Sequence, residues 1–343
     1  TKGLEHMKAW QFNGFGLENL NKVELSTPTP GPKEILVRVK AVSLNYRDKA
    51  IVDGIYLPEL MKPPFVPVAD ASGEVVSVGA EVTKFKEGDR VTSHMFTEWV
   101  DGKPSLTLGE SALGGPNNGG LAEYMILKED TTVKTPDNMT DEEASTLPIA
   151  ALTVWMSLVE FGKIKAGETV LVQGTGGVSV YAIQIASALG ARVIATSSSN
   201  EKLERVKALG ATDVINYKET PAWEKEVLKL TNGEGVNHIL EVVGGEGVNQ
   251  SIEALTPQGN IYVIGFLNGL ESKVNLFALL AKQAKIHGIN VGHRRAFDDM
   301  SRAFEQLQIK PVIDTIYGFD DAIEAYKHLY KGAFGKIVIK VAD

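Results

Sequence analysis

The chain has 343 residues, the length of about two domains, and its 43% apolar and 23% charged residues are typical of a folded globular protein. The formal net charge of −8 argues against nucleic acid or an anionic membrane surface as the main partner. Cysteine is absent, which excludes disulfides, iron–sulfur clusters, thiol catalysis and zinc sites with thiolate ligands.

Targeting features are also missing from the sequence. No apolar run reaches the roughly 18 residues of a membrane-spanning helix, and we find no signal peptide, so we expect a cytoplasmic protein without a membrane partner. The segment Thr1–His6 precedes Met7, and we interpret it as an expression scar.

The first third of the chain predicts β-structure. Residues 34–42 (EILVRVKAV) alternate apolar and polar side chains, which predicts a half-buried strand. Residues 75–78 and 90–92 predict two more strands. Residues 94–120 are rich in Gly, Asn and Pro and predict a long loop, and long ordered loops tend to be functional.

From Thr169 onward, strands and helices alternate, which predicts a doubly wound parallel sheet. The expected strands are 170–173, 192–196, 214–216, 238–243, 260–264 and 285–289, and the expected helices are 178–189, 200–209, 222–230 and 247–255. A last strand at 336–341 belongs to a tail that returns to the first domain. We therefore expect a dinucleotide-binding domain at 149–294, inserted between residues 7–148 and 295–343 of a β-rich domain.

A glycine-rich turn follows the first strand of this series. Residues 174–179 read GTGGVS, and Gly174, Thr175, Gly176, Gly177 and Val178 form the expected phosphate-binding turn and helix start. Gly174 permits the tight turn, and Gly176 lets backbone approach a pyrophosphate at the helix N-terminus. Ser179 stands where the motif has its third glycine. The alternative is a plain structural turn without a ligand.

The end of the second strand carries hydroxyls and a lysine where an NAD site usually has a carboxylate. Ser197, Ser198 and Lys202 can bind a 2′-phosphate, which a carboxylate would repel. The sequence therefore predicts NADP(H) as the cofactor. Alternatively, the serines only cap the next helix and Lys202 is a solvated surface charge.

Several motifs in the same order resemble the medium-chain dehydrogenase/reductase superfamily, and most of all its zinc-free quinone oxidoreductase and enoyl reductase branch. They are residues 36–39 (LVRV), 43–48 (SLNYRD), 73–76 (GEVV), 88–91 (GDRV), 147–153 (LPIAALT), the glycine turn, 209–211 (LGA) and 335–338 (GKIV). The resemblance implies an α/β protein with a Rossmann-type domain and a GroES-like β-rich catalytic domain, with the active site in the cleft between them.

The resemblance also shows where metal ligands are missing. Zinc-dependent members of the superfamily have a cysteine at the position of Asn45, a histidine at that of Ala69, and a third ligand at that of Ile149. Alanine and isoleucine cannot ligate a metal, so we expect no metal site. Without a Lewis acid, reduction of a quinone or of an activated C=C bond is more feasible than alcohol oxidation.

The resemblance assigns catalytic positions to Asn45 and Tyr46. Asn45 would lie near the nicotinamide and donate a hydrogen bond to a developing enolate, and Tyr46 would polarise or protonate the substrate. Asn45 could instead satisfy a local turn, and Tyr46 could simply pack. His94, in the long loop, is expected to be structural or solvated.

The remaining cofactor-binding positions lie mostly at strand ends, where open α/β sheets bind ligands. By the resemblance, Thr153 would contact the nicotinamide end of the cofactor, or it is simply a core residue. Tyr217 would contact the adenosine phosphate end, or it only covers the end of the sheet. The other predicted contacts are Gly244, Gly265, Phe266, Gly292 and Lys336.

The sequence therefore predicts an NADPH-dependent, zinc-independent oxidoreductase acting on a small carbonyl or quinone substrate. Two alternatives remain, a metal-free NADP-dependent alcohol or aldehyde oxidoreductase and a non-catalytic dinucleotide-binding protein. We also expect a homodimer, because the resemblance pairs the sixth-strand region across a two-fold axis and Leu276–Ala281 is an apolar run next to it.

Overall fold

The structure is a computed structural model that describes residues 5–343, so most of the segment interpreted as an expression scar lies outside the described residues. The chain divides into two compact units. Unit 1 comprises the chain up to Leu152 together with His293–Asp343, and unit 2 is Thr153–Gly292. The boundaries expected from the sequence were 148/149 and 294/295.

Unit 2 contains a six-stranded parallel sheet in the order β10-β9-β8-β11-β12-β13. This is the strand order of a Rossmann-type doubly wound sheet, which confirms the predicted fold class. The strands are β8 (Thr169–Gln173), β9 (Arg192–Ser197), β10 (Asp213–Asn216), β11 (Val236–Glu241), β12 (Leu255–Val263) and β13 (Lys285–Gly288).

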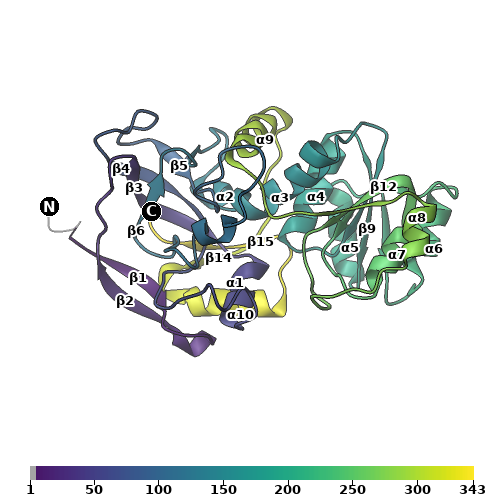
Figure 1. The fold of residues 1–343 in the computed structure, drawn as a ribbon, viewed down its shortest axis with the longest axis horizontal. Helices are drawn as coiled ribbons and strands as arrows, with labels where there is room; N and C mark the ends of the chain where they lie inside the picture. Colours follow the sequence, from purple (N-terminus) through teal and green to yellow (C-terminus); the bar gives the residue numbers. More distant parts are fainter. Residues whose placement is uncertain (1–4) are drawn as a thin grey trace. The chain divides into compact units, whose positions relative to one another are not determined.

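Helices lie on both faces of this sheet (Figure 1). Helices α4 and α5 pack on β8, β9 and β10, whereas α6, α7 and α8 pack beside one another on the other face. Both faces are therefore covered, and the middle strands are buried apolar runs, as parallel strands usually are. The helical elements are α3 (Leu152–Trp155), π-helical η5 (Met156–Phe161), α4 (Gly177–Ala188), α5 (Asn200–Ala208), α6 (Trp223–Leu230), α7 (Gly247–Ala254) and α8 (Leu276–Ala281).

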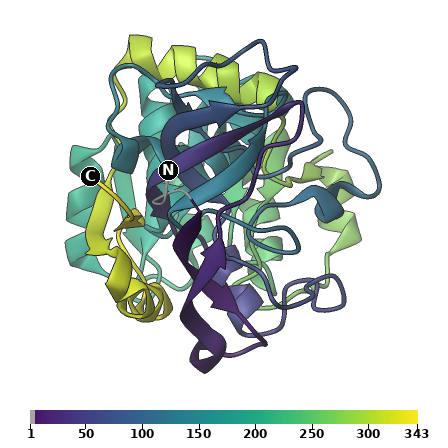
Figure 2. The same ribbon diagram turned by 90° about the vertical axis from the view of Figure 1, so that its left-hand side faces the viewer.

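Unit 1 is built on a second sheet, in the order β14-β15-β3-β4-β5-β7, with β6 also paired to β3. A separate hairpin of β1 and β2 projects from it (purple in Figure 2). The strands are β1 (His6–Phe12), β2 (Leu20–Ser26), β3 (Glu34–Ser43), β4 (Asp70–Val78), β5 (Arg90–Thr92), β6 (Tyr124–Lys128), β7 (Val133–Lys134), β14 (Ile313–Gly318) and β15 (Lys336–Lys340).

Strand β3 agrees with its alternating sequence. The apolar residues of the predicted pattern are buried, whereas its polar residues are less covered: Arg38 is exposed, and Glu34 and Lys40 are half-buried. The strand pairs antiparallel with β4, β6 and β15, so neighbours cover its edges along its length. β15 therefore lies beside β3, although almost 300 residues separate them along the chain.

The helices of unit 1 are short except near the C-terminus. They are α1 (Tyr46–Val52), α2 (Asp141–Ala144), α9 (Arg294–Leu307), α10 (Ala322–Lys331), π-helical η4 (Leu147–Ala151) and the 3-10 turns η2 (Leu17–Asn19), η3 (Leu108–Ser111) and η6 (Phe319–Asp321). The predicted loop at 94–120 contains η3 and two isolated bridges, Phe96–Ala112 and Leu113–Asn117.

Within residues 5–343, no helix has the length and apolar character needed to cross a bilayer.

Candidate active site and cofactor-binding residues

The glycine turn joins β8 to α4 and has the geometry of an anion-binding turn. Gly174 has a φ of +79°, a conformation that residues with a side chain rarely adopt. Gly176 precedes the first residue of the 12-residue helix α4, and no side chain of the described residues caps this end. Because the first N–H groups of a helix lack partners within it, this end can bind a pyrophosphate.

Space beside the turn fits such a ligand. A Cβ atom built on Gly176 would meet no atom within 4 Å among the described residues. The φ of −75° and ψ of −172° at Gly176 are extended values that any residue adopts. The strict need for glycine in the turn itself therefore falls on Gly174, and a ligand is what would require it at 176.

Ser179 compensates for the missing third glycine of the motif. Its hydroxyl donates to the carbonyl oxygen of Gln173 at 2.6 Å, and its side chain is buried between the helix and the strand. The small serine thus adds a hydrogen bond where the motif has a close packing contact.

A buried carboxylate that the sequence analysis did not identify organises the neighbouring strand end. Glu241, the last residue of β11, is fully buried and accepts from the Ser251 hydroxyl at 2.6 Å and from the N–H of Gly244 at 3.2 Å. The amide of Gln173, at the end of β8, lies 3.3 Å from the same carboxylate. This network fixes the turn that contains Gly244, whose φ is +68°.

The other strand-end glycine in this region is constrained by close packing. A Cβ on Gly265 would lie 2.9 Å from the carbonyl oxygen of Val242, so a larger residue does not fit without a shift. Phe266 follows it and is half-buried, and Gly292 is the last residue of unit 2. Thr153, in α3, is 3% exposed and buried in its surroundings.

At the tip of β9 the structure places the three predicted residues together. Ser197 is buried, Ser198 is exposed, and Lys202 lies in the first turn of α5 with intermediate exposure. Ser199 caps α5 by accepting from the N–H of Lys202 at 3.3 Å, so one serine of the run has the capping role considered as the alternative.

Two side chains from the end of β10 lie at the same end of α5. Tyr217 is 42% exposed, so its ring is open to a ligand. Glu219 accepts from the side chain of Asn200, the first residue of α5, at 3.1 Å. The Glu219 carboxylate therefore lies at the same end of α5 as Lys202. The residues at the tip of β9 gave no sign of it, because Glu219 follows the next strand.

In unit 1, three segments meet around Asn45. Its Nδ2 donates to Asp70 Oδ2 at 2.9 Å, and its Oδ1 accepts from Lys336 Nζ at 2.6 Å. Lys336 also donates to the carbonyl oxygen of Leu44 at 2.7 Å, and its Nζ is 3.6 Å from Asp70 Oδ2. The cluster thus brings together the end of β3, the start of β4 and the start of β15.

Both charged members of this cluster are buried, Lys336 with 2% and Asp70 with 0% of the residue exposed. Burial raises the pKa of Asp70 and lowers that of Lys336, and the attraction between the two charges opposes both shifts. The Ser43 hydroxyl lies 3.0 Å from Asp70 Oδ2, whereas Asp70 Oδ1 has no hydrogen-bond partner in the described part of the chain.

Helix α1 continues this buried polar region. The Asp48 carboxylate accepts from the N–H of Asn45 at 2.8 Å, and burial raises the pKa of Asp48 to about 6 although Arg47 and this hydrogen bond lower it. The guanidinium of Arg47 lies over the Tyr56 ring at 5.0 Å and donates to the Gly115 carbonyl oxygen. Tyr46, the other predicted catalytic residue, is half-buried at the first position of the helix.

The residues around Asn45 do not fit a zinc ion. At the position where zinc-dependent members have a cysteine, the only possible metal-ligating atom is the Asn45 Oδ1, which already accepts a hydrogen bond from the Lys336 ammonium group. Ala69 and Ile149 have no atom that can ligate a metal. Among residues 5–343, no cluster of three or more His, Cys, Asp or Glu side chains is arranged to hold a metal. We therefore derive no catalytic step through zinc.

His94 has the structural role expected for it. It is 1% exposed, and its Nδ1 lies 2.8 Å from the carbonyl oxygen of Phe96.

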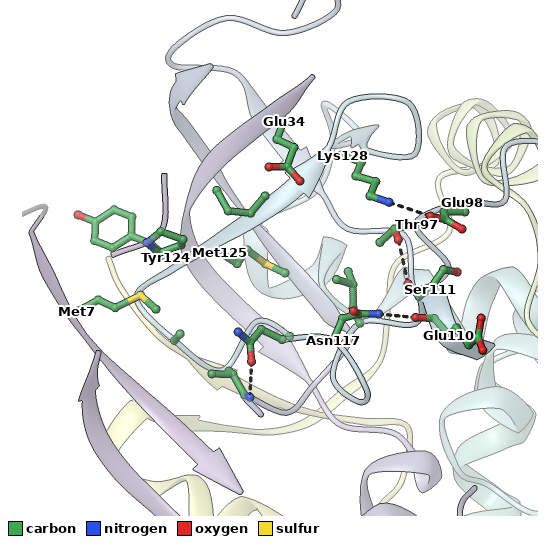
Figure 3. Close-up of a pocket in the computed structure, with 17 residues that line it drawn as sticks. Met7, Glu34, Thr97, Glu98, Glu110, Ser111, Asn117, Tyr124, Met125 and Lys128 are labelled. Carbon is green, nitrogen blue, oxygen red and sulfur yellow. Dashed lines mark hydrogen bonds and ion pairs between the residues drawn. The ribbon is translucent and has the colours of Figure 1, made fainter. Parts of the chain in front are cut away.

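Residues of the loop 94–120 line a cavity of about 280 Å³ in unit 1 (Figure 3). Thr97, Glu98 and Ser111 lie on one side of it, where Lys128 donates to Glu98 at 3.2 Å. None of the predicted catalytic or cofactor-binding residues lines this cavity, so we do not place the active site there.

Family comparisons agree with both units. The alcohol dehydrogenase GroES-like domain family matches residues 31–137, and the zinc-binding dehydrogenase family matches residues 177–308. A zinc-type alcohol dehydrogenase-like protein of Schizosaccharomyces pombe is 43% identical over 95% of this chain and 96% of its own length. A chloroplastic quinone oxidoreductase of Triphysaria versicolor is 30% identical over 97% and 98%.

Solved structures share the fold over almost the whole chain. A Sinorhizobium meliloti protein described as an alcohol dehydrogenase has a TM-score of 0.93 and 44% identity, covering 98% of this chain and 99% of its own. An NAD-dependent alcohol dehydrogenase has a TM-score of 0.89 and 34% identity, covering 98% and 100%. The 2-octenoyl-CoA carboxylase reductase CinF, solved with NADP and 2-octenoyl-CoA, has a TM-score of 0.88 and 25% identity, covering 98% and 88%.

We expect Gly176→Val to abolish binding of a nicotinamide dinucleotide and to leave the protein folded, because a Cβ there meets no protein atom but would meet the ligand. Cofactor titration by fluorescence or calorimetry measures the effect, with circular dichroism as the check on folding. Parental NADPH affinity in the folded variant would show that the phosphate site lies elsewhere.

Gly174→Val is the matched control. Its φ of +79° strains a β-branched residue, so this variant should lose about 1–3 kcal/mol of stability in urea unfolding. Comparing Gly176→Val with Gly174→Val therefore distinguishes a side chain that blocks the ligand from one that strains the backbone of the same turn.

Proposed function

The chain belongs to the medium-chain dehydrogenase/reductase superfamily, and on that premise we propose that it is an NADPH-dependent, zinc-independent oxidoreductase that reduces a quinone or the activated C=C bond of an α,β-unsaturated carbonyl. One observation carries the proposal. Asn45, at the position of a metal ligand in zinc-dependent members, is held by Lys336 and Asp70 so that an N–H group is left to donate. A donor suits the oxygen of an enolate or a hydroquinone anion.

Residues of unit 2 would bind the cofactor, and residues of unit 1 would act on the substrate. A bound nicotinamide dinucleotide supplies the hydride. The turn at Gly174–Gly176 and the N-terminus of α4 would bind its pyrophosphate, and the Glu241 network holds the Gly244 turn in place. Asn45 donates to the substrate oxygen as negative charge develops there. Tyr46 is our candidate for polarising or protonating the substrate.

For the other cofactor contacts we propose the residues identified at the strand ends. Thr153, Gly265, Phe266 and Gly292 would contact the nicotinamide half, and Tyr217 the adenosine phosphate end. Lys336 was also predicted to bind the cofactor, but its donors face acceptors inside unit 1, and we assign it a different role below.

Two alternatives stay open, and the relatives support one of them. An alcohol or aldehyde oxidoreductase is favoured by the S. pombe and S. meliloti relatives, which are described as alcohol dehydrogenase-like. The predicted non-catalytic role would require cofactor binding without turnover. The cytoplasmic location stays a prediction, because the relatives include chloroplastic quinone oxidoreductases.

We expect the purified protein to oxidise NADPH in the presence of a panel of enones and quinones, followed at 340 nm. Activity should survive chelators, and elemental analysis should find no stoichiometric zinc, since the positions of Asn45, Ala69 and Ile149 do not form a zinc site. Turnover with aldehydes alone would favour the first alternative, and tight binding without turnover would favour the second. One chelatable zinc per chain, lost together with activity, would contradict the proposal.

Lys202→Ala should weaken NADPH binding much more than NADH binding, because its ammonium can form a charge-assisted bond to the 2′-phosphate. Loss of such a bond costs about 1.5–3 kcal/mol, or roughly ten- to a hundredfold in affinity. Glu219→Gln is the opposite control and should strengthen NADPH binding, since it removes a negative charge at the same end of α5. Equal affinity of the parent for both cofactors would contradict the assignment.

We also propose a homodimer. Leu276, Phe277 and Leu280 on α8 are 63–74% exposed, and β13 leaves an open edge at the end of the parallel sheet. Light scattering should give twice the chain mass of 37.0 kDa. Phe277→Glu should shift the mass towards one chain, whereas Leu106→Glu, at an exposed leucine of unit 1, should not. A parental mass of 37.0 kDa at micromolar concentration would contradict the dimer.

A further inference from the structure

Lys336 is a buried cation whose contacts all lie within unit 1. An ammonium group can donate three hydrogen bonds and accept none. Its partners are the carbonyl oxygen of Leu44 and the side-chain oxygen of Asn45, with the Asp70 carboxylate 3.6 Å away. Because Lys336 can only donate, the oxygen end of the Asn45 amide must face it.

Asp70 fixes the other end of the same amide. Its Oδ2 accepts one N–H of Asn45 at 2.9 Å. An amide has two N–H donors, so one donor of Asn45 remains. Asn45 itself is half-buried, whereas Lys336 and Asp70 are buried.

We propose that Lys336 is a positioning residue that determines which end of the Asn45 amide is offered to the substrate, so that the atom recognised there is a hydrogen-bond acceptor. The substrate is then bound through an acceptor oxygen, such as that of a carbonyl or a quinone, and not through a hydroxyl hydrogen. This inference rests on the proposed function and specifies its substrate class.

The buried charges account for the rigidity that this role needs. Asn45 lies between a cation and an anion, and rotating its amide by 180° would turn its NH₂ group towards the ammonium and its oxygen towards the carboxylate. Both contacts would then be repulsive, so a single orientation is stable. If Lys336 bound the cofactor, as the sequence predicted, its ammonium would have to leave Leu44, Asn45 and Asp70 for a phosphate.

The test compares Lys336→Met alone and in an Asn45→Ala background. The single variant should lower kcat/KM for the acceptor about ten- to a hundredfold, less than or comparable to the loss of an oxyanion donor. In the Asn45→Ala background the same substitution should change kcat/KM less than about threefold, because Lys336 acts through Asn45. The Kd for NADPH, measured by calorimetry, should stay within about twofold of the parent.

Two further variants keep the test decisive. Lys336→Met leaves Asp70 as an unpaired buried charge and could unfold the protein, so Lys336→Met with Asp70→Asn removes both charges together. This double variant should fold, by circular dichroism, and keep the reduced kcat/KM. Lys340→Met, in the same strand β15 but with its side chain 44% exposed, should match the parent.

A loss of NADPH affinity of tenfold or more would overturn the inference in favour of cofactor binding by Lys336. Equal effects of Lys336→Met with and without Asn45 would overturn it in favour of a purely structural role, as would parental kcat/KM in the folded double variant. Failure of the proposed function is distinguishable, because the parent itself would then show no NADPH oxidation with any enone or quinone.

Discussion

A buried ammonium group imposes the constraint on which the polar centre of unit 1 depends. Lys336 has lost contact with water, so it needs acceptors from the protein, and it finds them on the turn between β3 and α1 and at the start of β4. Removing one partner of a buried pair costs about 3–5 kcal/mol, because the other charge is left uncompensated. Residues 45, 70 and 336 are therefore tied to one another. The antiparallel pairing of β15 with β3 makes this possible, since it returns the end of the chain to its first third.

Unit 2 also contains a buried charged side chain that depends on hydrogen bonds from the protein, in this case a carboxylate. Glu241 is fully buried at the end of β11, and three neighbouring donors satisfy it, from Gln173, Gly244 and Ser251. Like Lys336, it forms hydrogen bonds that hold a turn, here the one that contains Gly244. In both units a buried polar group at a strand end is hydrogen-bonded to neighbouring backbone, and such contacts supply the rigidity that preorganised sites require.

The sequence predicted the parallel sheet and its helices closely, because their signals are local. The strands are short apolar runs, Ser199 caps α5, and Gly174 marks a turn with positive φ. Unit 1 was predicted less completely. The hairpin of β1 and β2 and the short strands β6 and β7 were not identified, and the burial of β3 comes from neighbours distant in the chain. The partners of Lys336 were equally hidden, since a contact across 291 positions leaves no local pattern.

The same cluster bears on the direction of the proposed reaction. Oxidation of an alcohol requires a group that accepts the hydroxyl proton, whereas reduction of a carbonyl-activated bond requires a donor to the oxygen. Two carboxylates lie next to Asn45. Asp70 is fully buried and its Oδ2 is occupied by Asn45 and Ser43, and the buried Asp48 accepts from the backbone N–H of Asn45 at 2.8 Å. Lys336 can accept a proton only after losing its own; burial lowers its pKa, whereas the adjacent Asp70 carboxylate opposes that shift, and its ammonium already donates to Leu44 and Asn45. What the cluster offers is the remaining N–H of Asn45. The side chains held around Asn45 thus suit a substrate that presents an acceptor oxygen, which the proposed reduction requires.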